Sequence, residues 1–279
     1  MPLTTIYDGG TRIVGDANAI EQSLHPTVMA YINIMRSSTG GNYSMTINQI
    51  DAVNNMVQAL VANGIWTKIK AIYPVIGGTA AAHKFNLIDP RDADAAFRLN
   101  FVGGWTHAST GMTPNGTTGY ANTFLNATTV QTTNHLAFYS RTLTVGTGLE
   151  MGAATLTYNQ LRASNTSGNY GGYLSGALNL SGWTTTNDAR GFWIGSKISN
   201  SDRRSFRNGI QQGSNLTSDT NVHPNLNIWI GGRNDSNFLN AASNKECALA
   251  SIGDGLTAVE ALAFYQIVQA FQTKLGRQV

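Results

Sequence analysis

The sequence predicts a mainly β protein, an antiparallel sandwich with an N-terminal arm, a helical segment and a C-terminal closing helix. From about residue 75 the apolar residues recur with a period of two, between turns rich in Gly, Asn, Ser and Thr. Residues 25–73 and 257–275 instead show helical periodicity. Charged residues make up only 12% of the 279 residues, about half the usual share. Neutral polar side chains must therefore keep the surface hydrated.

Residues 1–22 are expected to form an extended N-terminal arm. Gly9-Gly10 and Gly15-Asp16 interrupt any helix, and no period is sustained. Such a segment is either frayed or held against a partner. We favour a contact arm for assembly, because it carries apolar residues that a partner surface would bury: Ile6, Tyr7, Ile13 and Val14.

Residues 23–74 are predicted to be a helical segment. Pro26 suits the first turn of a helix, and Thr46 with Gln49 forms a capping box for a second helix. Asn63-Gly64 should end that helix. The stretch "IWTKIKAIYP" is predicted to restart a short helix that ends at Pro74. The apolar stripe of the second helix is Ile50, Val53, Val57, Leu60 and Val61.

Residues 75–279 are predicted to form the sandwich. In "LNIWIGG", Ile228 and Ile230 alternate with Trp229, so they lie on opposite faces of a strand. Further candidate strands are "HLAFYSRTLTV", "RGFWIGSK" and "AFRLNF". In "SFRNGIQQGS", Asn208-Gly209 predicts a type I′ hairpin turn in which Arg207 pairs with Ile210. The hairpin explains this pair without a ligand.

The closing helix spans residues 257–275 and begins with a second capping box, Thr257 and Glu260. It should cover part of the sandwich. Its predicted buried face is Val259, Leu262, Ala263, Ile267, Ala270, Phe271 and Leu275, with Gln266, Gln269 and Lys274 in solvent.

Four stretches follow one another in the C-terminal third: "GFWIGSK", "RSFRNGIQQGS", "NLNIWIGGRNDS" and "ECALASIGDGLTAVEALAFYQIVQAFQTKLGR". In this order they resemble the end of a laminin-G-like, concanavalin A-like jelly roll. The ending "IGDGLT" before the helix is similar to domains of tailed-bacteriophage virion proteins. The middle, from "IWTKIKAIYPVIGG" to "GTTGYANT", also resembles such proteins, so the resemblance covers residues 64–279. It implies a jelly roll in a viral setting, but such domains include lectins, glycanases and spacers.

Catalytic residues are not indicated. Glycanases with this fold place two or three carboxylates at alternating positions of one strand, and none of the four glutamates has a carboxylate two residues away. Asp89, Asp92 and Asp94 cluster beside Pro90, where a turn with capping aspartates is expected. No two histidines have His-x-x-x-His spacing, and no nucleophile elbow occurs. We therefore expect no enzyme, with a polysaccharide-cleaving enzyme as the third hypothesis.

No cofactor is expected, and calcium is the alternative. Asn234, Asp235 and Asn237 follow a strand, and Asp254 lies in "SIGDG". Oxygen-rich loops of this kind can hold Ca²⁺, but an Asx turn explains the same residues and is favoured. Cys247 is expected to be a buried strand thiol.

Sugar binding requires an exposed aromatic ring beside amides and hydroxyls. The candidate glycan-binding residues are Tyr170, Tyr173, Trp183 and Trp229. The alternative is that these rings pack under neighbouring elements.

The expected function is a structural component of a bacteriophage virion, most directly an external capsid decoration or shell-associated protein with a lectin-like sandwich. The alternative is a tail-associated module that binds a glycan or receptor. Expected partners are other virion proteins and copies of the chain itself, with cell-surface or environmental polysaccharide in the alternative. Neither nucleic acid nor a membrane is expected as a partner, since no long basic or apolar run occurs. The expected location is the virion, after synthesis in the host cytoplasm.

Overall fold

The computed structural model describes residues 4–8, 11–15, 24–41, 43–146, 148–163, 170–176, 180–185, 187–217 and 222–279. For residues 4–8, 11–15, 170–176, 180–185 and 216 it gives the path of the backbone. Two large sheets face each other, and the predicted mainly β sandwich is confirmed.

We call the sheet that lies between the helices and the other sheet the inner sheet. Its strand order is β15-β14-β13-β8-β19-β6-β5, with β3 also paired to β19. Its strands are β3 (Ile69–Tyr73), β5 (Trp105–Ala108), β6 (Gly111–Pro114), β8 (Asn134–Ser140), β13 (Gly191–Ser199), β14 (Asp202–Arg207), β15 (Ile210–Leu216) and β19 (Cys247–Gly253).

The second sheet, which we call the outer sheet, has the order β12-β11-β10-β9-β16-β7-β4, with β17 beside β9 and β18 beside β17. Its pairings are antiparallel except for β17 with β9. Its strands are β4 (Asn100–Val102), β7 (Tyr120–Asn126), β9 (Met151–Ala154), β10 (Tyr158–Arg162), β11 (Tyr170–Gly176), β12 (Leu180–Thr185), β16 (Asn227–Ile230), β17 (Arg233–Asp235) and β18 (Phe238–Asn240).

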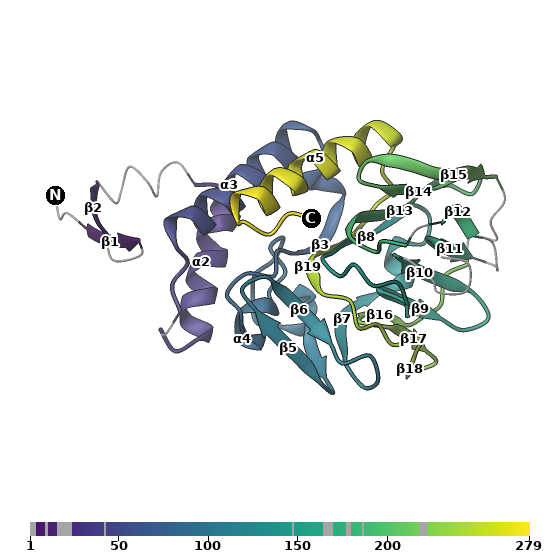
Figure 1. The fold of residues 1–279 in the computed structure, drawn as a ribbon, viewed down its shortest axis with the longest axis horizontal. Helices are drawn as coiled ribbons and strands as arrows, with labels where there is room; N and C mark the ends of the chain where they lie inside the picture. Colours follow the sequence, from purple (N-terminus) through teal and green to yellow (C-terminus); the bar gives the residue numbers. More distant parts are fainter. Residues whose placement is uncertain are drawn as a thin grey trace.

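Helices cover the side of the inner sheet that faces away from the outer sheet (Figure 1). They are α2 (Pro26–Ser38), α3 (Ile47–Ala62) and α5 (Ala258–Lys274), with a short α4 (Ala80–His83) and 3₁₀ turns at Trp66–Lys68, Asp94–Ala96 and Ala127–Val130. The molecule thus has three layers and two apolar cores. One core lies between the helices and the inner sheet, and the other lies between the sheets.

Strand β8 shows how the two cores are divided. Leu136 and Phe138 point into the core between the sheets, whereas Ala137 and Tyr139 point toward the helices. This is the alternation that "HLAFYSRTLTV" predicted. In "AFRLNF" the prediction was wrong for most of the stretch: Phe97 is left-handed at φ 59°, and only β4 is a strand there.

The helical segment largely follows its prediction. Pro26 opens α2, and Thr46 and Gln49 form the capping box of α3. The predicted helix in "IWTKIKAIYP" is wrong, because one 3₁₀ turn is followed by strand β3, which pairs with β19. Branched and aromatic side chains on both faces of Ile69–Tyr73 meet the two apolar cores, and this burial favours a strand.

The Asn208-Gly209 pair forms the predicted hairpin turn. Arg207 pairs with Ile210 across β14 and β15, and both turn residues have positive φ. The turn packs on helix α5, since a Cβ on Gly209 would lie 2.7 Å from Leu262 Cδ1. Its role is to join the end of the inner sheet to the closing helix.

The capping box of α5 is present, and its predicted buried face is right in part: Phe271 is buried, and Ala263, Ile267 and Leu275 pack partly buried against the core. Val259 and Leu262, predicted to be buried, are 78% and 42% exposed. Apolar residues surround most of this helix, so periodicity alone does not select the face that packs on the sheet. The buried residues are Ala261, Phe264, Val268, Phe271 and Gln272.

Within the arm, β1 (Thr4–Asp8) and β2 (Thr11–Gly15) form a two-stranded antiparallel sheet. Ile6 pairs with Ile13, and Thr5 with Val14. The side chains of the predicted contact residues, Tyr7 among them, lie outside the described residues. Figure 1 draws these strands beyond α2, on the side away from the sheets.

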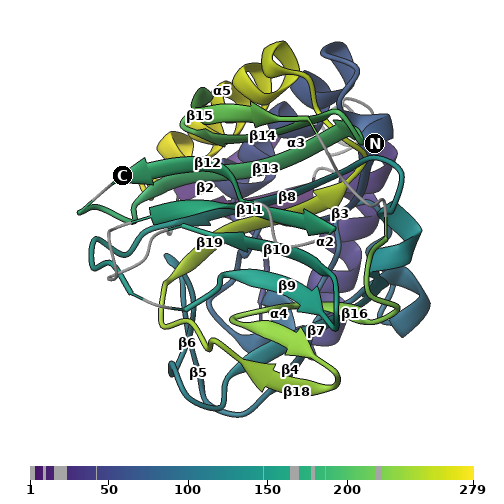
Figure 2. The ribbon, with the colours of Figure 1, turned by 90° about the vertical axis from the view of Figure 1, so that its right-hand side faces the viewer.

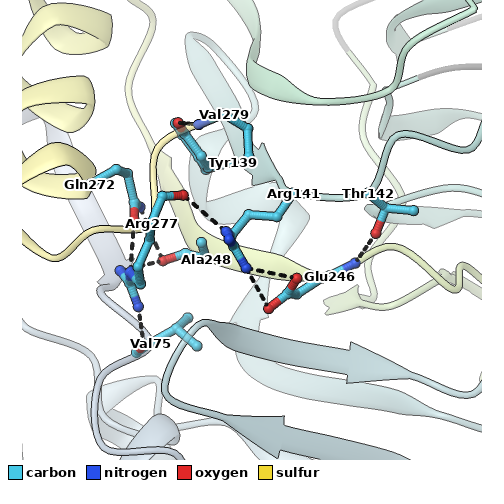
Figure 3. A network of polar contacts seen from close by, with 9 residues as sticks. All are labelled: Val75, Tyr139, Arg141, Thr142, Glu246, Ala248, Gln272, Arg277 and Val279. Carbon is cyan, nitrogen blue, oxygen red and sulfur yellow. Dashed lines mark hydrogen bonds and ion pairs between the residues drawn. The ribbon is translucent and has the colours of Figure 1, made fainter.

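The end of the chain is held by a buried guanidinium (Figure 3). Arg277 donates hydrogen bonds to the carbonyls of Val75 and Ala248 at 2.7 and 3.1 Å. A further bond, to the carbonyl of Pro74, is 3.1 Å long. The backbone carbonyl of Arg277 accepts a bond from Arg141 Nε at 2.9 Å. These contacts join the segment after α5 to β19 and to the segment that follows β3.

Candidate functional site

The face of the outer sheet that points away from the inner sheet carries the candidate site. Figure 2 looks toward this sheet, with the helices on the far side of the molecule. Strands β7, β9, β10 and β16 lie side by side, and β17 follows β16. We call the group on this face the outer patch. It consists of Tyr120, Tyr158, Gln160, Arg162, Trp229, Arg233 and Asp235.

Strand alternation puts these side chains on one face. In β7 burial alternates strictly, so Tyr120 is half-buried while Ala121 faces the core between the sheets. In β10, Leu161 faces the same core, so its neighbours Gln160 and Arg162 face outward. The local pattern thus assembles the patch from strands that are far apart in sequence.

An aromatic pair forms one side of the patch. The rings of Tyr120 and Trp229 stack, with centroids 3.8 Å apart and planes at 14°. Trp229 is only 6% exposed, so it does not supply the open platform that the sequence suggested. Tyr120 lies against Trp229 and is the more exposed ring.

A guanidinium forms the other side. Arg233 Nη1 donates to Gln160 Oε1 at 3.2 Å, and Nη2 lies 2.5 Å from Asp235 Oδ2. The Arg233 guanidinium carbon also lies 5.6 Å from the ring centroid of Tyr158. These contacts fix a planar cation between an amide, a carboxylate and a ring.

Three buried donors of the patch have no acceptor within the described residues. They are the indole N–H of Trp229 and the Nε–H groups of Arg162 and Arg233. A buried tryptophan N–H usually finds a partner, and an unpaired buried donor destabilises a fold by about 1–3 kcal/mol. The arrangement suits an external group rich in oxygen acceptors.

The charge of the patch is uneven. Burial lowers the pKa of Arg162, and the nearby carboxylate of Glu150 offsets part of this effect. Glu150 is itself fully buried and paired with Lys245 at 3.0 Å. Among the described residues Arg162 has no ion pair, so it is the cation of this face that lacks a direct counter-ion.

The other predicted aromatic residues lie close by in the sheet. Tyr170 and Tyr173 belong to β11, which pairs with β10, and Trp183 belongs to β12. Tyr173 is opposite Leu161 in the ladder. Their side chains lie outside the described residues.

The predicted calcium residues are not gathered around one point. Asn234 Oδ1 accepts the N–H of Asn237 at 2.8 Å, which is an Asx turn, and Asp235 pairs with Arg233. Asp254 follows β19 in the other sheet and pairs with Lys70 at 3.3 Å. The Asx-turn interpretation therefore accounts for these residues. In the part of the chain that the structure covers, no group of three or more His, Cys, Asp or Glu is placed to hold a metal.

The histidines have structural roles. His83 Nδ1 lies 2.9 Å from His107 Nδ1, and His135 lies 2.7 Å from the carbonyl of Asp254. Burial lowers the pKa of His83 to about 3 and of His135 to about 4. Both rings are therefore neutral at pH 7. Cys247 is buried in β19, and burial raises the pKa of its thiol, as expected for a structural cysteine.

The arginine cluster beside the hairpin is used within the protein. Arg203 is buried, and Arg204 pairs with Asp202 at 2.7 Å. Arg207 donates to the carbonyl of Arg190 and lies over the ring of Trp193. This cluster does not form a free basic surface.

A second surface feature lies on the helical side. Helices α3 and α5 form an apolar groove of about 420 Å³, with Lys274 and Asp51 at one end. Its lining includes Ala52, Met56, Ala59, Ile267, Ala270 and Phe271. Val259 and Leu262 are two further exposed apolar side chains of α5, outside this groove.

The sequence and the structure were compared with known proteins, and only solved structures gave matches. No protein family model matches the sequence, and no curated protein matches it significantly. Among solved structures, domain 4 of AbnA, a GH43 extracellular arabinanase from Geobacillus stearothermophilus, is similar with a TM-score of 0.49. The two share 14% identity over 71% of this chain and 98% of that chain. A mutant of Trypanosoma rangeli sialidase gives a TM-score of 0.50 at 9% identity, over 81% of this chain.

The matched region spans 40% of the sialidase chain, and identities this low show the fold alone. They do correct one expectation. The prediction that the chain is no enzyme does not stand, because its fold also occurs in a glycosidase chain. Within the described residues, no helix is long and apolar enough to cross a membrane.

Sequence reasoning found Trp229 and Asp235 but missed the other five members of the patch, which are Tyr120, Tyr158, Gln160, Arg162 and Arg233. The period of two in "YANTFLN" and "YNQLR" contains the information that Tyr120 and Arg162 face outward. Their proximity to Arg233 depends on strand order, which no local pattern gives.

Proposed function

We propose that the chain is an external structural component of a bacteriophage particle, attached at the capsid or another shell site. The observation that carries this proposal is the two-sided build of the molecule. Helices α2, α3 and α5 cover one side, and α3 and α5 carry exposed apolar residues, whereas the opposite sheet presents a polar and aromatic face. The resemblance of residues 64–279 to virion proteins supplies the viral setting.

The apolar residues of the helical side support packing against neighbouring subunits. Leu262 on α5 lies beside the hairpin turn, Ile210 next to that turn is 68% exposed, and Val259 nearer the start of α5 is also exposed. Contiguous exposed apolar surface on a folded protein usually marks an interaction site. Low charge fits a chain that is packed among many copies.

Gold labelling of intact particles with an antibody to this protein tests the proposal. Label over the capsid supports a shell or decoration role, whereas label confined to the tail moves the chain to the tail. Particles from an infection with the gene deleted provide the control for antibody specificity. Absence of label from all particles, despite labelling of the purified protein, contradicts the virion proposal.

The second candidate is a module that binds a glycan or receptor, and the outer patch favours it. The stacked Tyr120 and Trp229 lie on one face with the amide of Gln160 and the carboxylate of Asp235. Aromatic rings beside polar groups suit sugar rings. A glycan array with the full chain tests this candidate, and release of reducing sugar from each bound glycan is measured in parallel. Tyr120→Ala should weaken binding at least tenfold, and an unchanged profile counts against the patch.

A further inference from the structure

We infer that the outer patch takes an acidic sugar, with a carboxylate of the sugar beside the guanidinium groups of Arg162 and Arg233. This inference rests on the second candidate function, glycan contact, and names the class of glycan.

The first step is the spacing across the sheet. Gly152 on β9 pairs with Trp229 on one side and with Gln160 on the other. Gly152 also pairs with Arg233 on β17, and the Arg233 side chain crosses this glycine to reach Gln160. The Arg233 guanidinium and the aromatic pair therefore lie within two strand spacings of each other, about 10 Å, so one sugar could contact the rings and place its carboxylate at the guanidinium.

The second step is the donors. The Nε–H groups of Arg162 and Arg233 and the indole N–H of Trp229 are buried without acceptors among the described residues. The oxygen of a neutral sugar hydroxyl can accept a hydrogen bond from one such N–H group. A carboxylate has two oxygens and about four acceptor positions, so it can satisfy several donors at once.

The third step is the charge. The carboxylate of Asp235 is already bonded to Arg233 and to the amide of Asn240 at 2.9 Å. Glu150 is paired with Lys245. The two acidic side chains that the described residues place near the patch are thus engaged, and within that part of the chain Arg162 has no ion pair. A bound anion would supply it, and charge-assisted bonds to arginine are the strong ones.

The experiment measures binding of tetragalacturonate by titration calorimetry, with a neutral galactose tetramer as the matched probe. We expect the acidic tetramer to bind at least tenfold more tightly, and its affinity to fall as salt rises. Arg162→Gln and Arg233→Gln should each weaken it at least tenfold, with Arg233→Lys intermediate. The control is Arg36→Gln, which removes one exposed cation from α2 on the other side of the molecule and should leave binding unchanged.

Thermal unfolding of each variant shows whether it is folded. Equal binding of both tetramers, weakened by Tyr120→Ala, overturns the acidic preference and leaves glycan contact standing. Binding of neither tetramer, together with an empty glycan array, overturns both. Acidic binding that survives both arginine changes shows that the site lies elsewhere. Full displacement by inorganic sulfate at equal charge concentration shows a simple anion site, which also overturns the inference.

Discussion

Gly209 combines two requirements in one residue. Its φ is 74°, and a Cβ at this position would lie 2.7 Å from Leu262 Cδ1 and 3.1 Å from Leu262 Cα. The first requirement comes from the hairpin turn and the second from helix α5. Both exclude a branched side chain.

Gly209→Val should therefore destabilise the protein by about 3 kcal/mol or more, because left-handed strain and overpacking each contribute about 1–3 kcal/mol. Chemical denaturation measures the change. The matched control is Gly64→Val, where φ is 69° but nothing lies within 4 Å, so strain acts alone. Adding Leu262→Ala should recover part of the loss at position 209. Equal losses at positions 64 and 209 would show that the contact with α5 does not matter.

The buried histidines make stability depend on pH. His83 Nε2 accepts the N–H of Gly78 at 3.0 Å, so the proton of the neutral ring is on Nδ1 and points to His107. Protonation of His83 would place a second N–H against Gly78. His135 is likewise buried, between the carbonyl of Asp254 and the Ser251 hydroxyl.

The folded pKa values, about 3 for His83 and about 4 for His135, lie below the unfolded value of about 6.5. The stability that the two neutral rings contribute to the fold is thus fully present above pH 6.5, and it is lost as the pH falls toward 4. We expect the free energy of unfolding to drop by a few kcal/mol between pH 7 and pH 4. The double variant His83→Gln/His135→Gln should flatten this slope, as followed by thermal unfolding. An unchanged slope would assign the acid sensitivity to other groups.

At the scale of elements, the segment after α5 attaches the closing helix to the inner sheet. Arg277 bonds to carbonyls at Pro74, Val75 and Ala248 and to Gln272 Oε1 at 2.9 Å, so one side chain connects α5 with β19 and the segment after β3. Burial lowers its pKa to about 10, which still leaves it charged at neutral pH.

Arg277→Met should destabilise the fold by about 3–5 kcal/mol, since it leaves several buried carbonyls without donors. Denaturant unfolding measures the loss. Arg98→Met provides the control, because Arg98 pairs with Asp92 and Asp94 at the surface and such pairs contribute about 1 kcal/mol or less. Similar losses of stability for both variants would contradict this role of Arg277.

Local chemistry decided which elements the sequence predicted well. Thr46 with Gln49 and Thr257 with Glu260 cap their helices as expected, and Asn208-Gly209 turns as expected, because each depends on neighbours in the chain. Strand β3 was taken for a helix because it pairs with β19, whose residues lie about 180 positions further along the sequence. The outer patch could not be predicted from local sequence for the same reason. Tyr120 and Arg233 belong to strands whose order in the sheet is set by the whole fold.

The misassigned face of α5 has a consequence for the whole molecule. Val259 and Leu262 were expected in the core, but they are exposed on the helical side. The apolar surface is therefore larger than the sequence suggested, and it lies on the side opposite the outer patch. A particle subunit that packs through its helices would leave that patch free to meet a glycan.

The arm belongs to the same scale. Among the described residues, β1 and β2 pair with each other and with no strand of the sandwich. Deleting residues 1–22 should therefore leave the unfolding temperature of the sandwich unchanged to within about 1 °C. Surface changes usually alter the free energy of unfolding by only a few tenths of a kcal/mol, which corresponds to a shift of about this size. Under the virion proposal the same deletion should abolish incorporation into particles.

Mass spectrometry of purified particles measures incorporation of the shortened chain against the full chain in a co-infection. The matched variant is Ile6→Asp/Ile13→Asp, which keeps the arm's length but places charge at one pair of the β1–β2 ladder. If apolar contact holds the arm in the particle, this variant should also fail to incorporate while its sandwich stays folded. Normal incorporation of the deletion would leave the helical side as the docking surface, and Leu262→Asp would then be the variant expected to stay out of particles.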